Sequence, residues 1–221
     1  MTDVEARIPQ SRTGPEIDQL APDFEARTTR GMVRLSDYRG KWLIFFSHPA
    51  DFTPVCTTEF MSFERHSNAF DKLNCALLGL SVDSVFSHIA WVKDIEANFG
   101  VKITFPIIED ISMEISRAYG MVHERSSTTA AVRSVYFIDP DGYVRSMIHY
   151  PANVGRSVPE ILRVLAALQL SDAQNVATPE NWSPGDKAVR LPPLDQSEAD
   201  ARSEEKDSVW YVTEIEGGKN G

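Results

Sequence analysis

The chain has 221 residues and carries a formal net charge of −10 at neutral pH. Its hydrophobic content of 42% is ordinary for a globular protein, and its length allows one domain with its own core plus a small additional segment. The acidic balance speaks against nonspecific binding to nucleic acid or to an anionic membrane surface, because both are negatively charged. The longest apolar runs, such as residues 42–46, are too short to cross a bilayer.

The chain contains two cysteines, Cys56 and Cys75, so it is not a disulfide-stabilised scaffold. Residues 1–7 carry acids and lack the apolar core that a secretory signal peptide needs. These features predict a cytoplasmic protein that works in a reducing compartment.

In chain order, residues 1–15 are polar and are predicted to form a flexible N-terminus. The continuous apolar run at 41–47 predicts a strand that is buried on both faces. We expect a helix from Cys56 towards Phe70, followed by a second buried strand at 75–82.

The next predicted helix has clear signals at both ends. Asp83 or Ser84 can cap its start, and Gly100 is suited to the position just after its end. Its apolar residues recur at helical spacing and are expected on its buried face: Ile89, Ala90, Val92, Ile95 and Phe99.

The following region favours short elements. Residues 103–108 are expected to form a third strand, and Asp110 can cap a short helix after it. Residues 134–138 form the clearest strand of the second half. The Asp-Pro-Asp-Gly turn signal at 139–142 then predicts that 143–148 returns as an antiparallel strand.

Ser157 and Glu160 fit a capping box with an early proline, which opens a further helix. Its buried stripe is expected to be Ile161, Leu162, Leu165 and Leu168. The order strand, helix, strand, helix, hairpin, helix predicts an α/β fold with a mixed sheet flanked by helices. Open sheets of this kind bind ligands beyond the carboxyl ends of their strands, which is where Cys56 falls.

The composition changes after about residue 170. Residues 178–193 contain four prolines and a glycine and are poorly suited to a helix or a central strand. Three aromatic residues, Trp182, Trp210 and Tyr211, nevertheless favour packing of this tail. The predicted organisation is a flexible N-terminus, a main domain and a C-terminal arm, at 1–15, 16–170 and 171–221.

The most informative segment follows the first buried strand and reads Pro49-Ala50-Asp51-Phe52-Thr53-Pro54-Val55-Cys56. It places a cysteine in the first turn of the expected helix. Free backbone N–H groups and the positive end of the helix dipole lower the pKa of a thiol in such a place. Thr53 can aim its hydroxyl at the same point, and the two prolines stiffen the loop. The pattern indicates a site that holds a reactive thiolate.

The residues around this cysteine resemble a known family. Residues 46–59 are similar to the active-site segment of peroxiredoxins, in the alkyl hydroperoxide reductase/thiol-specific antioxidant superfamily. The Ser47-His48-Pro49 start and the threonine pair after Cys56 resemble the one-cysteine, peroxiredoxin-six-like subfamily most. The likeness extends over about residues 16–195. Further matching positions are 20–24, Arg133 ahead of the strand at 135–138, 150–156 and 178–182.

The resemblance implies a thioredoxin-like fold and thiol-dependent reduction of hydrogen peroxide and alkyl hydroperoxides. The reaction passes through a cysteine sulfenic acid that an external small-molecule or protein thiol recycles. The resemblance also implies homodimers, in some members rings of dimers, with a C-terminal arm that reaches over the neighbouring subunit. No bound cofactor, no metal, no nucleic acid and no membrane are expected.

The resemblance assigns catalytic roles to four residues. Cys56 is the expected nucleophile, and Thr53 is expected to donate its hydroxyl to the peroxide oxygen and to touch the sulfur. Arg133 is expected to hold a guanidinium near the sulfur and to bind the polarised oxygen. Pro49 is expected to shield the site from water, or simply to end the strand before it.

Three further residues have less specific expectations. His48 either lines the pocket near Cys56, as in the subfamily, or is a hydrogen-bonded structural histidine. Glu59 and Arg156 either form a polar shell that orients Arg133 or are ordinary surface charges. Cys75 lies within an apolar strand and is interpreted as a small buried hydrophobe.

Four other functions compete with this interpretation. A thioredoxin-type oxidoreductase needs a second cysteine where Glu59 stands, and the lipase activity of some subfamily members needs a serine that residues 38–42 lack. The cysteines and histidines show no recognised zinc-ligand spacing. A non-enzymatic peroxide sensor or ring-shaped holdase stays open, and differs from an enzyme in that it stops after one equivalent of peroxide.

Overall fold

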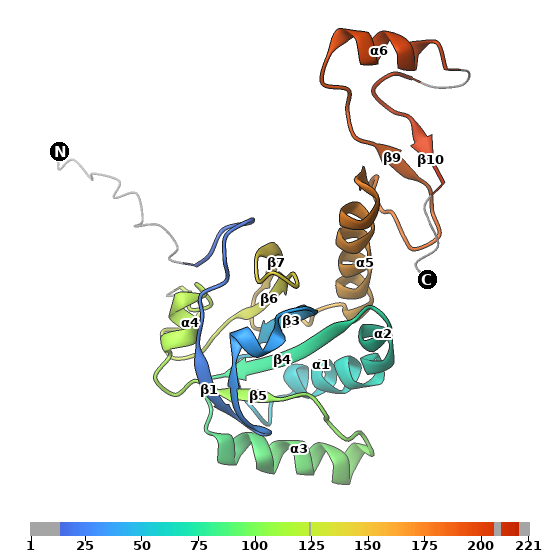
Figure 1. Cartoon of the computed structure of the whole chain (residues 1–221). Helices are drawn as coiled ribbons and strands as arrows, with labels where there is room; N and C mark the ends of the chain where they lie inside the picture. Colours follow the sequence, from blue (N-terminus) through green and yellow to red (C-terminus); the bar gives the residue numbers. More distant parts are fainter. Residues whose placement is uncertain (1–13, 124, 206–208, 217–221) are drawn as a thin grey trace, which may run out of the picture. The chain divides into compact units, whose positions relative to one another are not determined.

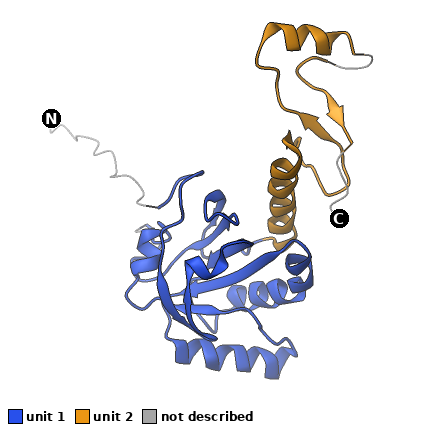
Figure 2. Ribbon diagram, in the orientation of Figure 1, with its two compact units in different colours: residues 1–156 blue, residues 157–221 orange. Residues whose placement is uncertain are grey.

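The computed structural model describes residues 14–123, 125–205 and 209–216 (Figure 1). The chain divides into two compact units, residues 1–156 and 157–221, which Figure 2 distinguishes by colour and which we describe separately. The N-terminus predicted to be flexible lies, up to residue 13, outside the described residues. The predicted domain limits at residues 16, 170 and 171 stay a prediction.

The first unit contains a seven-stranded mixed sheet, in the order β2-β1-β5-β4-β3-β6-β7. Strands β3, β4 and β5 run parallel, and the other neighbouring pairs are antiparallel. The strands are β1 (Glu25–Thr28), β2 (Gly31–Arg34), β3 (Trp42–Ser47), β4 (Cys75–Ser81), β5 (Ile107–Glu109), β6 (Arg133–Ile138) and β7 (Val144–Tyr150). The predicted α/β class and mixed sheet are therefore confirmed.

The helices of this unit are η1 (Leu35–Tyr38), α1 (Pro54–Arg65), α2 (Ser67–Lys72), α3 (Val85–Phe99) and α4 (Glu114–Ala118). The single helix expected from Cys56 to Phe70 is in fact two helices, because the helical backbone is interrupted at His66. The His66 ring donates a hydrogen bond from Nδ1 to the Ser62 carbonyl at 2.8 Å, and its backbone N–H points to the same carbonyl.

The core has two layers, one on each face of β3. On one face Phe46 stacks on Phe63 of α1, with ring centroids 4.2 Å apart. On the other face Phe45 meets Tyr119, just after α4, at 4.8 Å and nearly edge to face. Because successive strand residues point to opposite faces, one apolar run supplies both layers.

The predicted buried face of α3 is wrong in part. Ile89 and Phe99 are exposed to 38% and 54%, whereas the fully inward positions are those of Val85, His88, Trp91 and Ile95. The ends of the helix are as predicted: Ser84 caps its first turn, and Gly100 follows it in the left-handed region at φ 67°. The inward position that the hydrophobic pattern predicted for Ile89 is therefore occupied by the polar side chain of His88.

Two short elements also differ from expectation. Strand β5 covers three residues and begins four residues later than predicted. Helix α4 starts after Met113, which is left-handed at φ 60°, so Asp110 does not stand next to it. The Asp110 carboxylate nevertheless accepts hydrogen bonds from the backbone of Ile115 at 3.2 Å and of Ser116 at 2.7 Å. Asp110 therefore still caps α4 through its side chain, although it does not directly precede the helix.

The predicted hairpin is confirmed. Strands β6 and β7 pair antiparallel, and the turn between them is closed by the N–H of Gly142 donating to the Asp139 carbonyl at 2.9 Å. Gly142 has a φ of 83°, which a glycine adopts without strain.

The second unit consists of two helices and a small sheet, in the order β10-β9-β8. Its elements are α5 (Val158–Gln174), β8 (Val176–Ala177), β9 (Ala188–Arg190), α6 (Gln196–Ser203) and β10 (Glu214–Ile215). Ser157 caps α5 as predicted, by accepting from the N–H of Glu160. The expected buried stripe of α5 holds for Ile161 and Leu165, while Leu162 and Leu168 are half-buried.

The tail is more ordered than its composition predicted. Strand β9 is the central strand of the small sheet although it lies in the proline-rich segment. Trp182 is buried, and its indole N–H donates to the Asp186 carbonyl at 3.1 Å, so the predicted packing of this residue is confirmed. Trp210 and Tyr211 remain exposed within this unit. Every described helix is too short or too polar to pass through a lipid bilayer.

Candidate active site

The candidate site lies where β3 ends and β6 begins. The two strands are antiparallel and their last paired residues at this end are Phe46 and Val135, so Arg133 at the start of β6 lies close to the end of β3. Ser47 fastens this end of the pair: its hydroxyl donates to the Val132 carbonyl at 2.6 Å and accepts from the N–H of Ser134 at 3.2 Å. Two segments far apart in sequence are thereby held in register at the site.

Cys56 is the third residue of α1 and is fully buried. Thr53 precedes the helix in an extended conformation, and Pro54 occupies the first turn, where its missing N–H costs nothing. The N–H groups of this turn have no carbonyl partner within the helix, so they and the helix dipole favour negative charge at this end. The predicted placement of Cys56 in a first turn is confirmed.

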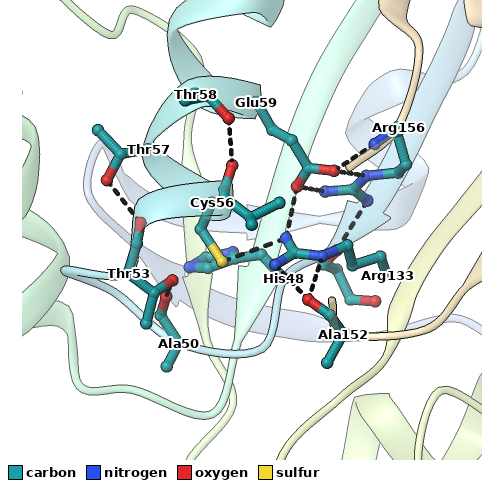
Figure 3. A network of polar contacts seen from close by, with 12 residues as sticks. His48, Ala50, Thr53, Cys56, Thr57, Thr58, Glu59, Arg133, Ala152 and Arg156 are labelled. Carbon is teal, nitrogen blue, oxygen red and sulfur yellow. Dashed lines mark hydrogen bonds and ion pairs between the residues drawn. The ribbon is translucent and has the colours of Figure 1, made fainter. Parts of the chain in front are cut away.

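Arg133 places its guanidinium on the sulfur. Its Nη1 lies 3.3 Å from Cys56 Sγ and 2.7 Å from Glu59 Oε2 (Figure 3). Its Nε and Nη2 both donate to the Ala152 carbonyl, at 2.9 and 2.7 Å. One Nη2 proton has no acceptor among the described residues. The fork is therefore fixed by three partners and keeps one donor available.

Glu59 and Arg156 form a buried polar shell, as one of the two interpretations predicted. Glu59 Oε1 accepts from the backbone N–H and Nε of Arg156 at 2.8 and 2.9 Å, and Oε2 accepts from its Nη2 at 2.7 Å (Figure 3). Arg156 Nη1 donates to the carbonyls of Ser47 and Ser134. The guanidinium also lies over the rings of Phe46 and Phe63.

The two arginines determine the ionisation of Glu59. Burial raises the pKa of Glu59, but the charge and hydrogen bonds of Arg156, with the charge of Arg133, outweigh burial and hold that pKa below its ordinary value of 4.5. The carboxylate is thus ionised in the fold. The same position excludes the thioredoxin-type alternative, because a glutamate engaged by two arginines stands where the second cysteine belongs.

The loop before α1 is a tight turn. The Thr53 hydroxyl donates to the Ala50 carbonyl at 2.8 Å, and Phe52 is left-handed at φ 54°, an uncommon conformation for an aromatic residue. Thr53 precedes Cys56 by three residues, a spacing that puts both on the same side of the helix start. Pro49 is half-buried at the end of β3.

His48 is fully buried and hydrogen-bonded, with Nε2 2.8 Å from Asp51 Oδ1. Its ring stacks on Trp91 at 5.2 Å and meets Phe60 edge to face at 4.7 Å. Phe60 lies one turn after Cys56 on α1, so the His48 ring packs against α1 one turn beyond Cys56. His48 is thus a buried, hydrogen-bonded histidine, and its expected place in the pocket beside Cys56 stays a prediction.

Sequence reasoning missed two residues of this region, Asp51 and His88. His88 Nδ1 lies 2.8 Å from Asp51 Oδ2, which joins α3 to the active-site loop. Together with His48 these side chains offer three ligand-type atoms within 4.8 Å of one another. Separations of 2.8 Å are hydrogen bonds, since nitrogen and oxygen ligands on one zinc ion lie about 3.3 Å apart. The cluster does not fit a metal ion in this geometry.

Cys75 lies in a different part of the sheet. It is buried at the start of β4, opposite Trp42, and burial raises the pKa of its thiol to about 12. The Cys56 loop begins after Ser47, five residues further along β3, or ~16 Å at the rise of a strand. Both cysteines are free in this structure.

Comparisons with known proteins agree with this geometry. Residues 17–147 match the AhpC/TSA family, and residues 167–206 match the C-terminal domain of 1-Cys peroxiredoxin. The chain is 53% identical over 196 residues to peroxiredoxin 2 of Picrophilus torridus, covering 89% of this chain and 96% of that protein. It is 49% identical over 197 residues to the peroxiredoxin of Thermoplasma volcanium, with coverage of 89% and 96%.

Solved structures give the same result. The yeast mitochondrial 1-Cys peroxiredoxin, whose thiol is resolved through the glutathione/thioredoxin systems, has a TM-score of 0.82 at 39% identity, over 91% of this chain and 99% of that one. Peroxiredoxin 6 of Arenicola marina has a TM-score of 0.82 at 36% identity, over 93% and 100%.

Fold and site together define a thiol-dependent peroxidase, an oxidoreductase on a thioredoxin-like fold. The chain belongs to the AhpC/TSA family and is a peroxiredoxin of the 1-Cys type. It reduces peroxides through a cysteine sulfenic acid that an external thiol recycles.

The substitution Glu59→Gln tests the buried shell. At neutral pH we expect it to lower the free energy of unfolding by about 3 kcal/mol, because two buried guanidinium groups lose their carboxylate. A carboxyl group with a lowered pKa stabilises the fold above its ordinary pKa of 4.5 and loses this contribution as the pH falls through the folded value. The difference between parent and variant should therefore narrow below pH 4.5.

Urea unfolding at a series of pH values, from neutral to acid, measures this difference. The matched control is Glu25→Gln, which removes an exposed ion pair to Arg34 at 2.9 Å and should change the free energy by less than about 1 kcal/mol. A gap between parent and Glu59→Gln that stays constant with pH would contradict the assignment of Glu59 as an ionised buried anchor.

Proposed function

We propose that Cys56 is the peroxidatic nucleophile and that Arg133, Thr53 and Pro49 complete the catalytic site. The observation that carries this proposal is the 3.3 Å contact between Arg133 Nη1 and Cys56 Sγ at the start of α1. A guanidinium and a helix N-terminus converge on one buried sulfur, and both favour its thiolate. A thiolate is the form of cysteine that attacks an electrophile.

In the proposed step the sulfur electron pair attacks the terminal peroxide oxygen in line with the O–O bond. The S–O bond forms and the O–O bond breaks, which gives the sulfenic acid and an alkoxide or hydroxide that takes up a proton. The remaining Nη2 proton of Arg133 supports a role in holding the departing oxygen. The Thr53 hydroxyl was expected to donate to the peroxide, but it donates to the Ala50 carbonyl, so we propose instead that its oxygen accepts the O–H of the peroxide.

Glu59 and Arg156 are proposed to support the site without touching the peroxide. Glu59 holds Arg133 against the sulfur, and Arg156 holds Glu59 by three hydrogen bonds. Pro49 is proposed to limit the access of water at the end of β3, and His48 to line the pocket beside Cys56. Water exclusion strengthens the electrostatic interactions of the charged groups.

We further propose that no bound cofactor takes part and that the electrons come from an external thiol. The yeast 1-Cys relative, resolved through glutathione/thioredoxin systems, supports a reductant of one of these two classes. The inert, buried Cys75 supports an external rather than an internal reductant. Two unpaired cysteines support a reducing compartment such as the cytoplasm.

Serine substitutions separate the two cysteines. We expect Cys56→Ser to lower peroxide consumption with excess dithiol to the background rate, because an alcohol cannot replace the thiolate. The matched variant Cys75→Ser should keep the parent rate, and peroxide-treated parent should show no disulfide-linked dimer on a non-reducing gel. Consumption that stops after one equivalent would instead indicate a sensor, and an active Cys56→Ser variant would refute the assigned nucleophile.

Arg133→Lys tests the guanidinium. Lysine keeps the charge but cannot bind the Ala152 carbonyl and Glu59 at once as the fork does. We expect kcat/KM for hydrogen peroxide to fall by about 100-fold. The control Arg27→Lys, at an exposed position on β1, should leave kcat/KM unchanged. An Arg133→Lys enzyme with the parent value would exclude a catalytic role for the fork.

We also propose that the chain forms homodimers that assemble into rings. Strand β7 is the last strand of its sheet; Val144 at its start bonds to Asp18 and Gln19, and the position of the later residues at the edge supports pairing with a second copy. Three exposed apolar side chains lie on segments near the site, which we name the apolar cluster: Phe52, Phe86 and Ile111 are exposed to 58%, 75% and 61%. Hydrogen bonds from Asp51 to Asp83 and from Val85 to Glu109 draw the segments that carry them together. This cluster supports a second interface. The C-terminal arm is proposed to cover the neighbouring subunit.

Sedimentation velocity tests the ring. We expect the parent to sediment as a multimer of dimers and Phe86→Arg to sediment as dimers, because a charge on the apolar cluster opposes the second interface only. Phe99→Arg, on the same helix and 54% exposed, is the matched control and should leave the parent size unchanged. A parent that sediments as a dimer at every concentration would refute the ring.

A further inference from the structure

The loop that follows β7, residues 151–155, lies at the active site and has no role in the chemistry described so far. It leaves β7 at Tyr150, which pairs with Arg133 of the neighbouring strand. It ends at Arg156, which is buried and bonded to Glu59. Both ends of the loop are therefore fixed by residues of the site or by their direct neighbours, although its own five residues are exposed.

The loop contacts Arg133 through one backbone carbonyl. The oxygen of Ala152 accepts from Arg133 Nε at 2.9 Å and from Nη2 at 2.7 Å (Figure 3). Nη1 of the same guanidinium lies 3.3 Å from the Cys56 sulfur and 2.7 Å from Glu59. The planar group is thus held on two sides, by α1 through Nη1 and by the loop through Nε and Nη2.

The loop fixes what the contact with α1 leaves variable. A single hydrogen bond from Nη1 to Glu59 allows the guanidinium to turn about that bond. The Ala152 carbonyl removes this freedom, because it binds two nitrogens of the rigid fork at once. The position of Nη1 relative to the sulfur therefore depends on where the loop places its carbonyl.

A second contact places the loop against the first turn of α1. A Cβ atom on Gly155 would lie 3.3 Å from Val55 Cγ1. Carbon atoms pack at about 3.5–4.0 Å, so the added atom would be too close. Val55 directly precedes Cys56 in α1 and is half-buried. The backbone of the loop thus approaches the helix turn that carries the cysteine, and a residue without a side chain makes this approach possible.

Space, rather than backbone conformation, is what requires a glycine at this position. The φ of Gly155 lies outside the left-handed region, so the backbone there suits an alanine as well. Val55 does not move aside at low cost, because a β-branched side chain in a helix has one strongly preferred χ1 rotamer. An added methyl group would therefore separate the loop from α1.

The loop, and not the helix, would move. Helix α1 is held in the core by Phe60 and Phe63, which are fully buried. The loop residues are exposed, and within the loop the N–H of Val154 donates to the Pro151 carbonyl at 3.2 Å. Segments with few buried contacts are the ones that yield to strain. A displaced loop would carry the Ala152 carbonyl away from the guanidinium.

We propose that Gly155 is a positioning residue of peroxide reduction. Its close approach to Val55 holds the loop on α1, and the loop in turn holds Arg133 against the sulfur through the Ala152 carbonyl. This inference rests on the proposed nucleophile and on the proposed role of the guanidinium. It also gives a reason for the family resemblance at 150–156, since the backbone of this exposed loop is part of the site.

The parent protein provides the first test, which needs no substitution in the loop. The Nε–H of Arg133 is buried and bonded to Ala152, so its proton NMR signal should exchange slowly with water. The signal is assigned by its loss in Arg133→Lys. Fast exchange in the parent would overturn the proposal, even if every loop variant failed to fold.

Gly155→Ala tests the close approach. The value of kcat/KM for hydrogen peroxide, measured with excess dithiol, reports the steps up to the sulfenic acid and not its later recycling. We expect this value to fall by about tenfold, because a small displacement of a catalytic group greatly slows a reaction. The Nε–H of Arg133 should also exchange faster. A variant with the parent kcat/KM would contradict the proposed positioning.

Val55→Ala supplies the compensating change, since it removes the methyl group that an added Cβ at position 155 would meet. In this background, Gly155→Ala should change kcat/KM by less than about twofold, because contacting residues are not additive. A loss of about tenfold in both backgrounds would show that the contact with Val55 is not the cause, and would overturn the proposal.

Arg133→Lys tests whether the effect passes through the arginine. Lysine cannot make the fork to Ala152, so Gly155→Ala should lower kcat/KM by less than about twofold further in this background. A merely structural role for the loop would instead lower kcat/KM by the same factor with either residue at position 133. That result would refute the inference and leave the proposed nucleophile intact.

The control is Gly100→Ala, at the end of α3. Gly100 is left-handed at φ 67°, and an added Cβ would meet no non-neighbouring atom of the described residues within 4 Å. The substitution should lower stability through backbone strain and leave kcat/KM and the Nε–H exchange unchanged. An equal loss of kcat/KM in Gly100→Ala would overturn the positioning role. Peroxide reduction that persists in Cys56→Ser would refute the proposed function itself.

Discussion

The site depends on the hydrogen bonds that the Glu59 carboxylate accepts from two arginines. Glu59 lies three residues after Cys56 on α1, so the helix itself fixes the spacing between the cysteine and the carboxylate. The carboxylate accepts from Arg133 at 2.7 Å, and that guanidinium then lies 3.3 Å from the sulfur. Arg156 saturates the remaining lone pairs of Glu59 and leaves it little freedom. One rigid helical turn thus sets the position of a cation that comes from a distant strand.

The balance of buried charge explains why these groups occur together. Two guanidinium groups, of Arg133 and Arg156, surround one carboxylate, so the shell has an excess of one positive charge. An unbalanced charge in the protein interior is costly, and a thiolate at Cys56 removes the imbalance. On the other side of the site, the Asp51 carboxylate is held by hydrogen bonds with His48 and His88.

Sequence reasoning predicted the elements with local signals and missed contacts between elements. Three predictions that depend on a few adjacent residues were correct: strand β3, the glycine after α3 and the Ser157 cap of α5. The buried face of α3 was partly wrong, because hydrophobic periodicity treats a histidine as outward-facing. His88 is 37 residues from Asp51, and nothing near either residue in sequence indicates their hydrogen bond. Its one signal was the helical spacing of His88 with Val85, Trp91 and Ile95.

Arg133 could be matched to a family pattern from the sequence, but the position of its side chain follows from the register of strands β3 and β6. Arg133 opens β6, and the β3–β6 ladder ends at Phe46 and Val135, two residues short of it. Beyond that point the Ser47 hydroxyl replaces the ladder, bonded to both neighbours of Arg133 in the chain. Arg156 ties the carbonyls of Ser47 and Ser134 together from the other side. A shift of one residue in this register would turn Arg133 to the opposite face of the sheet, away from Cys56. The peroxide site is therefore specified by the pairing of two core strands as much as by the cysteine motif itself.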